Sequence, residues 1–301
     1  MTILMSDSMP KDKPHDTLNF MISEYLLSNG IDGEKIDDFI IDIPKKWEKF
    51  SDVILLPNSS FEEKKWDNHR TELWNIIVQA LGAKKLGIMG EIKGEKREST
   101  VKMLLGEDDW VIRRENGIKY GYRFTKCMFS SGNINERMRM GGVGKLDEVV
   151  VDLYAGIGYY SLPILVFSKI KHLHSFEWNP ESVRALEINL QSNGVTNRCS
   201  IHLGDNKITT NKFNNIADRV ILGLLPSAKE GYIPALNVLK DSGVLHIHGI
   251  AQSKNHDEWI KKTLTEINLI RPQATISEIS RFKIKSYAPH WDHIVLDVKV
   301  E

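Results

Sequence analysis

Three carboxylate side chains, those of Asp152, Glu177 and Asp205, have the types and spacing from which a nucleoside-binding site can be built. Asp152 and Glu177 each end an apolar run that predicts a β-strand, and Asp205 follows a third such run. Because the carboxyl ends of parallel strands meet at one edge of a sheet, we expect these side chains to lie close together. Glu177 stands 25 positions after Asp152, roughly the separation expected for a carboxylate that binds a ribose diol.

The segment after Asp152 predicts a tight turn into a helix. Gly156 and Gly158 allow the backbone to approach a ligand closely, and the following helix offers unpaired N–H groups at its start. The G-x-G-x-x-G spacing of dinucleotide-binding proteins is incomplete, because Ser161 stands where the third glycine should be. The pattern therefore favours an S-adenosylmethionine site over a dinucleotide site, with an ordinary strand-to-helix turn as the alternative.

The residues after the second and third strands could complete such a site. We expect Glu177 to accept hydrogen bonds from both ribose hydroxyls and Trp178 to pack against the nucleoside. Asp205 and Asn206 could recognise adenine through its exocyclic amine and a ring nitrogen. A plain turn is the alternative for the last pair, because Gly-Asp-Asn is good turn chemistry.

A polar segment, residues 129–139, lies just before the first of these strands. If it folds over the cofactor, Ser130 and Arg137 are available to the methionine carboxylate or to nearby oxygens. An amphipathic helix with exposed arginines explains the same pattern equally well.

Two histidines, His246 and His248, are two positions apart on a predicted strand and therefore face the same side. They could bind a metal ion, but no third ligand is recognisable nearby, so packing at the strand edge is the preferred interpretation. No G-x-S-x-G nucleophile motif of hydrolases is present. The sequence therefore predicts no metal, and it identifies no catalytic residue.

Strand and helix patterns alternate after residue 126 and predict a doubly wound α/β sheet. Strands are expected at 149–153, 173–177, 200–203, 219–223 and 244–248, with a clear helix at 180–194. The tail, 282–286 and 293–300, is typical of a closing β-hairpin that gives the sheet an antiparallel end.

The preceding part of the chain predicts two further regions. Residues 1–45 are expected to form a partly disordered extension, and residues 46–125 a small α+β domain. Within that domain we expect a helix at 61–81 and strands at 101–105, 110–113 and 119–124. Asn116-Gly117 is a strong hairpin signal between the last two strands.

The net charge of zero conceals an uneven distribution. Residues 1–83 hold 9 Lys and Arg against 15 Asp and Glu, residues 84–145 hold 14 against 8, and residues 146–301 hold 17 of each. The basic block is compatible with a local nucleic-acid contact, although a solvated charged face is the more ordinary explanation. The candidates for that contact are Lys93, Lys96, Arg97, Arg113, Arg114, Lys119, Arg123 and Lys126.

Composition excludes several classes of protein. The hydrophobic content of 41% is ordinary for a globular protein, and two cysteines, Cys127 and Cys199, are too few for a disulfide framework. No apolar run is long enough to span a membrane, and the start of the chain does not resemble a signal peptide. These features predict a cytoplasmic protein without a membrane partner.

Eight segments, in this order, closely resemble the family of tRNA wybutosine-synthesizing protein 2. The resemblance covers about residues 45–301 and is strong over 120–250. The segments are Cys127-Met-Phe-Ser-Ser-Gly-Asn133, Asn135-Glu-Arg-Met-Arg139, Asp152-Leu-Tyr-Ala-Gly-Ile-Gly-Tyr159, Glu177-Trp-Asn-Pro180, His202-Leu-Gly-Asp-Asn206, Ala217-Asp-Arg-Val220, Gly223-Leu-Leu-Pro-Ser227 and Leu245-His-Ile-His248.

The resemblance implies a Rossmann-like class I methyltransferase fold and a specific reaction. In this family the 3-amino-3-carboxypropyl group of S-adenosylmethionine is transferred to 4-demethylwyosine at position 37 of phenylalanine tRNA, and 5′-methylthioadenosine is released. The implied partner is the anticodon loop of that tRNA, and no obligate protein partner is implied. The family's cofactor contacts map to Ser130, Arg137, Glu177, Asp205 and Asn206.

Three other interpretations of the sequence remain open. The related tRNA (guanine-37 N1) methyltransferases have the same fold, but they carry Asn-Leu-Pro where this chain has Leu224-Leu225-Pro226, and Phe-Ser-Pro-Arg where it has Phe129-Ser-Ser-Gly. Both departures favour the aminocarboxypropyl transferase. A non-catalytic tRNA-binding module with a vestigial cofactor fold would be expected to have lost Glu177 or Asp205. A structural partner that binds the cofactor only to fold is the third.

Overall fold

A computed structural model describes residues 13–90 and 99–301 of the chain. Lys93, Lys96 and Arg97 of the predicted basic block therefore lie outside the described residues, as do the first 12 residues of the predicted extension. The chain divides into two compact units. The first unit contains residues 1–113 and 123–128, and the second contains residues 114–122 and 129–301.

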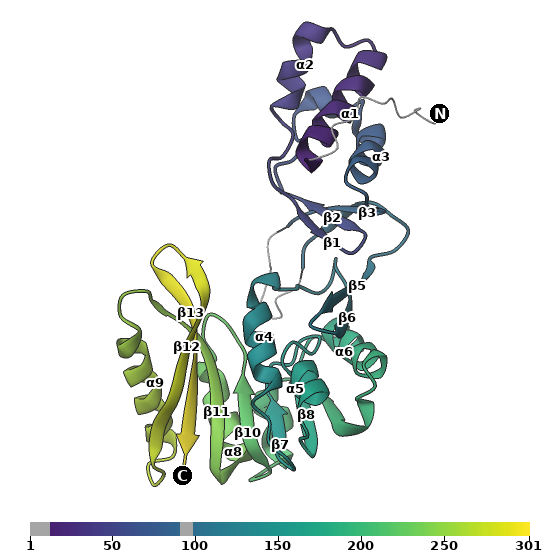
Figure 1. The fold of residues 1–301 in the computed structure, drawn as a ribbon. Helices are drawn as coiled ribbons and strands as arrows, with labels where there is room; N and C mark the ends of the chain where they lie inside the picture. Colours follow the sequence, from purple (N-terminus) through teal and green to yellow (C-terminus); the bar gives the residue numbers. More distant parts are fainter. Residues whose placement is uncertain (1–12, 91–98) are drawn as a thin grey trace. The chain divides into compact units, whose positions relative to one another are not determined.

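The second unit is built on a seven-stranded sheet in the order β12-β13-β11-β10-β7-β8-β9 (Figure 1). The five strands from β11 to β9 are parallel, and β13 is antiparallel to both β11 and β12. This order confirms the predicted doubly wound sheet with an antiparallel end. The strands are β7 (Val149–Asp152), β8 (His172–Glu177), β9 (Cys199–Leu203), β10 (Ala217–Leu222), β11 (Leu239–Gln252), β12 (Ile276–Ala288) and β13 (Trp291–Val300).

Helices cover this sheet and supply much of its core. Side chains of α8 and α9, such as Tyr232 and Ile260, pack with Val220 and Ile247 of the central strands, and all four are buried. The strands appear as apolar runs in the sequence because a parallel sheet is covered on both faces. The helices are α4 (Ile134–Gly141), α5 (Ser161–Phe167), α6 (Pro180–Ser192), α7 (Asn206–Thr209), α8 (Tyr232–Val238) and α9 (His256–Ile270).

Helix α6 begins where local chemistry favours a helix start. The side chain of Asn179 caps it by accepting a hydrogen bond from the Glu181 N–H, and Pro180 occupies the first helical position. The predicted helix at 180–194 is therefore confirmed.

In its described residues, the first unit combines three α-helices with a mixed four-stranded sheet in the order β1-β2-β3-β4. Its core contains Leu18 and Ile22 of α1, Phe39 of α2 and Leu73 of α3. The elements are α1 (Pro14–Ser28), α2 (Gly33–Ile40), α3 (Arg70–Ala80), β1 (Glu48–Phe50), β2 (Val53–Leu56), β3 (Lys85–Ile88) and β4 (Lys102–Leu105).

Two expectations about this unit were wrong. The helices at 14–40 share one core with α3, so residue 45 does not separate an extension from the small domain. The predicted helix at 61–81 begins only at Arg70, because Phe61 has a φ of 59° and a short 3₁₀ turn, Lys64–Trp66, precedes the helix. The apolar period at 61–69 instead reflects Phe61 and Trp66 packing edge to face in the core, with ring centroids 5.0 Å apart.

The predicted hairpin is confirmed as strands β5 (Trp110–Glu115) and β6 (Ile118–Arg123), with positive φ at both Asn116 and Gly117 between them. Asn189 of α6 and Asn193, the residue that caps its C-terminal end, bind the backbone of β6. The Asn189 amide pairs with the N–H and C=O of Gly121 at 2.6 and 3.0 Å, and the Asn193 amide pairs with those of Lys119 at 2.9 and 2.8 Å. We call this arrangement the asparagine clamp.

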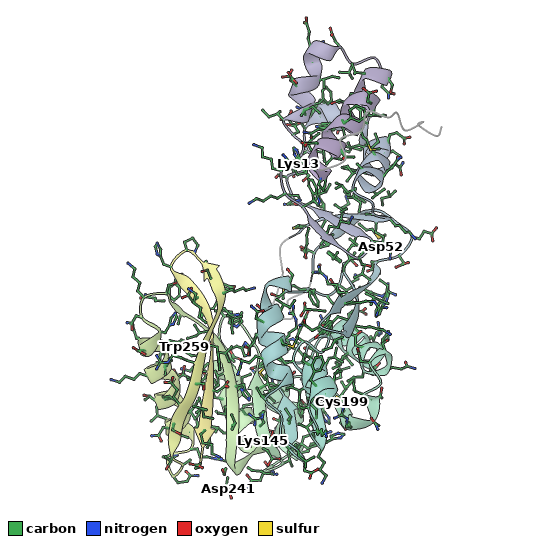
Figure 2. The ribbon with its side chains drawn as sticks, viewed as in Figure 1. Lys13, Asp52, Lys145, Cys199, Asp241 and Trp259 are labelled. Atoms are coloured by element: carbon green, nitrogen blue, oxygen red, sulfur yellow. The ribbon has the colours of Figure 1, made fainter. Side chains whose placement is uncertain are left out.

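Neither cysteine forms a disulfide. Cys127 is buried, and burial raises the pKa of the Cys199 thiol at the start of β9 to about 11 (Figure 2). Within the described residues, no helix is long and apolar enough to cross a membrane.

Candidate active site

The turn between β7 and α5 requires its glycines. Gly156 and Gly158 have φ values of +55° and +102°, which lie in the left-handed region. A Cβ atom at Gly158 would also lie 2.8 Å from Leu162, so the first turn of α5 approaches the glycine closely. A Cβ atom at Gly156 would likewise lie 2.5 Å from the Tyr159 ring, so both positions require glycine for the close packing of the turn.

Asp152 lies at the carboxyl end of β7 but is not exposed to a ligand. Its exposed fraction is 0%, and its two carboxylate oxygens accept hydrogen bonds from the Tyr154 N–H at 3.2 Å and the Ser161 hydroxyl at 2.8 Å. Burial raises the pKa of Asp152 to about 6. Ser161, which occupies the position of the missing third glycine, therefore ties the start of α5 to β7. We assign Asp152 to the shape of the turn, not to direct contact with a cofactor.

Glu177, at the end of β8, is joined to the same turn. Its Oε2 accepts a hydrogen bond from the Gly156 N–H at 2.7 Å, and its Oε1 accepts from the N–H groups of Trp178 and Asn179 at 3.0 and 2.8 Å. Burial raises the pKa of Glu177, although the three N–H donors oppose that shift. An ionised carboxylate can accept about four hydrogen bonds, so one position remains for a ligand hydroxyl.

Asp205 and Asn206 follow β9 at the same edge of the sheet. The Asp205 carboxylate caps α7 by accepting from the Lys207 N–H at 2.9 Å. Asn206 is buried, and its amide donates to the carbonyl of Leu153, immediately after β7, at 2.8 Å. The expected meeting of three strand ends is therefore present, with Asn206 linked to the first and Glu177 to the glycine turn.

Arg137 is oriented differently from the expectation for a carboxylate-binding residue. It is 1% exposed, and its Nε and Nη2 atoms bind the two carboxylate oxygens of Glu115 at 2.5 and 2.6 Å. Its Nη1 donates to the Ser130 carbonyl at 2.8 Å, and the guanidinium lies 4.8 Å from the centroid of the Phe129 ring. Its donors are therefore used inside the protein, so the assignment of Arg137 to the methionine carboxylate does not fit this arrangement.

A lysine that sequence reasoning missed lies beside Ser130. The amine of Lys285, on β12, is 3.3 Å from the Ser130 hydroxyl, and a Cβ atom on Gly132 would lie 2.8 Å from that amine. Among the described residues, no carboxylate lies within ion-pair distance of Lys285. Burial and the nearby Arg137 lower its pKa. Its position in the C-terminal hairpin gave no signal, because the contact joins residues 155 positions apart.

His246 and His248 are both buried in a polar network. His246 lies between Asp297 at 2.6 Å and Arg219 at 2.8 Å, whereas His248 contacts His293 at 3.1 Å and Tyr160 at 3.4 Å. Burial lowers the pKa of both histidines. Across residues 13–90 and 99–301, no three His, Cys, Asp or Glu side chains are placed to hold a metal ion.

The loop after β10 contains Leu224-Leu225-Pro226, where the related methyltransferases carry Asn-Leu-Pro. Gly223 lies against Tyr160, and a Cβ atom on it would be 2.8 Å from that ring. Leu224 packs against the core of the sheet as an apolar side chain. No amide is therefore available at this position to bind the edge of a guanine.

The strand order, the glycine turn and the acidic strand end define a Rossmann-like fold of the class I methyltransferase type. A family model described as the TRM5/TYW2 methyltransferase domain matches residues 111–271, and one described as the TYW2 N-terminal domain matches residues 24–109. The chain belongs to the family of tRNA wybutosine-synthesizing protein 2, within the wider TRM5/TYW2 group.

Individual relatives agree with this placement. The human tRNA wybutosine-synthesizing protein 2 homolog is 37% identical in a comparison that covers 86% of this chain and 70% of that protein. The tRNA wybutosine-synthesizing protein 2/3/4 of Arabidopsis thaliana is 39% identical over 92% of this chain, but the chain spans only 28% of that protein's length. The crystal structure of P. horikoshii TYW2 in complex with MeSAdo has a TM-score of 0.76 at 32% identity and covers 94% of this chain and 98% of that one.

Proposed function

We propose that this protein transfers the 3-amino-3-carboxypropyl group of S-adenosylmethionine to 4-demethylwyosine at position 37 of phenylalanine tRNA, with release of 5′-methylthioadenosine. The observation that carries the proposal is the hydrogen bond from the Gly156 N–H to Glu177 at the end of β8, because it places a carboxylate suited to a ribose hydroxyl beside the glycine turn. Family membership supplies the reaction. As an enzyme of tRNA modification, it would act in the cytoplasm on the anticodon loop.

The described residues fit the nucleoside part of the co-substrate. Glu177 would accept a hydrogen bond from a ribose hydroxyl, and Gly156 would allow close approach of the backbone. Asp205 and Asn206 would recognise adenine, with Asn206 held in place by the Leu153 carbonyl. Asp152 would act through the turn that it stabilises.

The methionine part needs a cation for its carboxylate. Lys285 and the Ser130 hydroxyl fit that role, because the lysine has no acidic partner among the described residues and the pair lies 3.3 Å apart. Arg137 would support them indirectly, by fixing the Ser130 backbone.

For this reaction the protein needs to orient the co-substrate more than it needs to activate it. A sulfonium is already a strong electrophile with a neutral thioether as its leaving group. Transfer breaks the bond from sulfur to the γ-carbon, forms a carbon–carbon bond to the tricyclic base and leaves a proton of that base to be lost. Binding the carboxylate at a fixed point would select which of the three carbons on sulfur meets the base, and proximity would supply most of the rate.

The test uses S-adenosylmethionine labelled separately in the methyl and carboxyl groups, with tRNA that carries the tricyclic intermediate. The carboxyl label should become attached to the RNA, and methylthioadenosine should be released. Plain guanosine at position 37 should be a poor acceptor, because Leu224 offers no amide to the guanine edge. Methylated guanosine with S-adenosylhomocysteine would instead establish the methyltransferase interpretation, and transfer of neither label would favour a non-catalytic module.

A further inference from the structure

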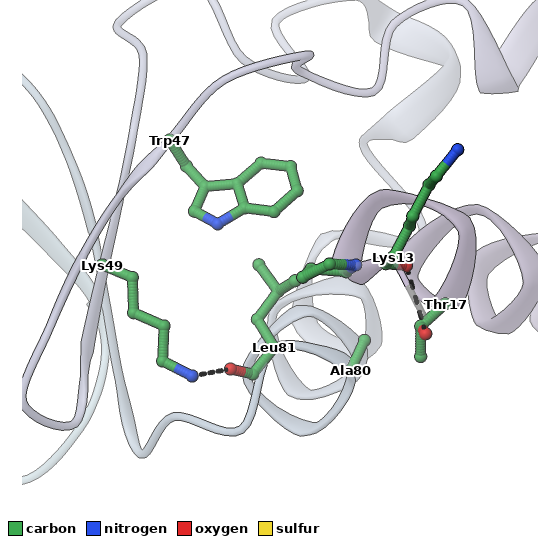
Figure 3. A pocket seen from close by; sticks show the side chains of 7 residues that line it. Lys13, Thr17, Trp47, Lys49, Ala80 and Leu81 are labelled. Atoms are coloured by element: carbon green, nitrogen blue, oxygen red, sulfur yellow. Dashed lines mark hydrogen bonds between the residues drawn. The ribbon is translucent and has the colours of Figure 1, made fainter. Parts of the chain in front are cut away.

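The first unit contains a pocket of about 350 Å³ around an aromatic ring. Figure 3 shows the indole of Trp47, on the segment that leads into β1, above the start of α1 and the end of α3. This volume lies near the lower end of the range for small-ligand pockets, roughly 300–1,000 Å³, and would suit a single nucleotide better than a duplex. The lining residues are Lys13, Pro14, Thr17, Trp47, Lys49, Ala80 and Leu81.

The surroundings of Trp47 are basic although the region is acidic overall. Residues 1–83 carry a net charge of −6 by their 9 basic and 15 acidic side chains. Lys13 and Lys49 line the pocket, Lys45 and Lys46 directly precede Trp47, and all four are exposed. We call these lysines and Trp47 the Trp47 surface.

These lysines differ from Arg113 and Arg123 of the predicted basic block in having no carboxylate partner in the part of the chain that the structure describes. Among the described residues, none of the four has a carboxylate within ion-pair distance, and the Lys49 amine bonds only the Leu81 carbonyl, at 2.5 Å. In contrast, Arg113 is paired with Glu48 and Arg123 with Asp109, each at 2.6 Å. Because each of these arginines already pairs with a carboxylate, it attracts a phosphate less strongly than an unpaired lysine does. The sequence count could not separate the two groups.

The indole itself is held in an orientation suited to stacking. The His15 ring is parallel to it within 7°, with ring centroids 6.2 Å apart. The imidazole contacts Asn19 at 3.3 Å, which fixes the ring on α1. Proteins bind single-stranded nucleic acid by placing aromatic rings among basic side chains, because every base has a face that can stack and every nucleotide has a phosphate.

We propose that the Trp47 surface binds one unstacked nucleotide of the tRNA, with its base on the Trp47 indole and the flanking phosphates at Lys13, Lys46 and Lys49. The inference deepens the proposed function, since it takes tRNA as the substrate, and it places a contact in the first unit, whereas the reaction belongs to the second. An acidic peptide could meet the lysines but would leave the aromatic face without a partner.

The experiment measures the affinity of the full chain for the phenylalanine tRNA by filter binding over a range of salt concentrations. Trp47→Ala should weaken binding roughly 5-fold to 100-fold, the range for loss of one base stack, whereas Trp47→Phe should retain most of the affinity. The double variant Lys13→Gln/Lys46→Gln should reduce the slope of log K against log salt by about 0.7 for each phosphate that a lysine no longer neutralises. The matched control is Lys35→Gln/Lys64→Gln, which removes the same charge from two exposed lysines of the first unit outside the pocket and should leave the slope unchanged.

Two further readouts separate this inference from the proposed function. Affinity for S-adenosylmethionine should be unchanged in every Trp47-surface variant, which also shows that the second unit remains folded. Unchanged tRNA affinity in folded Trp47→Ala and Trp47→Phe proteins would overturn the inference, even if labelled carboxyl groups reach the tRNA. Loss of tRNA affinity in Trp47→Ala without any transfer by the wild-type protein would support the surface and overturn the reaction. Competition by polyaspartate but not by single-stranded RNA would assign the surface to an acidic protein instead.

Discussion

Charged side chains near the candidate site form hydrogen bonds and ion pairs within the protein, which leave few of their atoms for a ligand. Both Asp152 oxygens accept hydrogen bonds from neighbouring protein groups, and Arg137 donates to both carboxylate oxygens of Glu115. Glu177 accepts three backbone hydrogen bonds. Residue type and spacing predicted that these groups lie near the site, with Asp152 and Glu177 at strand ends. They could not predict which protein groups these side chains bind, because those partners depend on the fold. Of the described cations beside the Ser130 hydroxyl, Lys285 has the most donor capacity left for a ligand, and no sequence motif identified it.

Replacement of Glu177 should weaken cofactor binding specifically. In Glu177→Ala, we expect the affinity for S-adenosylmethionine to fall by about 1.5–3 kcal/mol, the contribution of hydrogen bonds to a charged group. Glu181→Ala, four positions along in α6, removes a half-buried carboxylate that pairs with the exposed Arg184 and should have little effect. Titration calorimetry measures both, and an unchanged affinity in folded Glu177→Ala would remove the ribose assignment.

The pair of Arg137 and Glu115 should behave as a buried ion pair. Arg137→Met leaves the Glu115 carboxylate without its partner and should cost about 3–5 kcal/mol of unfolding free energy. The double variant Arg137→Met/Glu115→Gln removes both charges and should recover much of that loss. Urea unfolding of the four proteins of this cycle measures the coupling. If the two single changes simply added, the pair would not act as a unit.

Strands β8 and β9, at the edge of the large sheet, carry a row of histidines. His172 contacts Ser200 at 2.9 Å, and His174 contacts His202 at 3.0 Å with the rings stacked at 5.3 Å. Burial, followed by the neighbouring His172 and His202, lowers the pKa of His174 to about 4. The row is therefore neutral in the folded protein near neutral pH, and it packs as an aromatic stack.

This row should make the fold sensitive to acid. Between pH 6.5 and about 4 the unfolded chain binds a proton at His174 that the folded protein does not, so stability is lost as the pH falls through this window. We expect the wild-type protein to lose roughly 1–2 kcal/mol more than His174→Phe between pH 7 and pH 4.5, after allowance for solvent screening. Asp152 and Glu177, whose pKa values are raised, act in the opposite direction but equally in both proteins. Urea unfolding at the two pH values measures both losses. Equal losses of unfolding free energy in the wild-type protein and in His174→Phe would contradict this assignment.

At the scale of the whole molecule, the sequence predicted the large sheet well and the small unit poorly. Every predicted strand of the sheet is present, and the central parallel strands were recognisable because buried strands leave continuous apolar runs. The segments at 14–40 were taken for an extension, because short amphipathic helices carry little signal until their partners, such as Leu73 and Ile77, are known. Similarly, Lys285 and Ser130 meet only through the fold, so their proximity was not accessible from the sequence.

The boundary expected at residue 125 should fail as a point of truncation. A fragment of residues 126–301 lacks Glu115 and the β6 backbone, so Arg137 and the asparagine clamp would lose their partners. A fragment of residues 110–301 keeps them and should unfold with a higher midpoint in thermal denaturation, with S-adenosylmethionine binding retained. Equal midpoints for the two fragments would show that β6 contributes little to the second unit.

The path of the chain through residues 106–128 also restricts how this protein can be recombined with its relatives. The chain passes from one unit to the other three times in this stretch. A single crossover before residue 113 takes Glu48 and Arg113 from different parents, and one at the Asn116-Gly117 turn does the same to Asp109 and Arg123. A functional chimera should therefore require two parents that carry the same residues at both ion pairs. If relatives of this protein have exchanged domains during evolution, the two partners of each pair should still be complementary in every descendant.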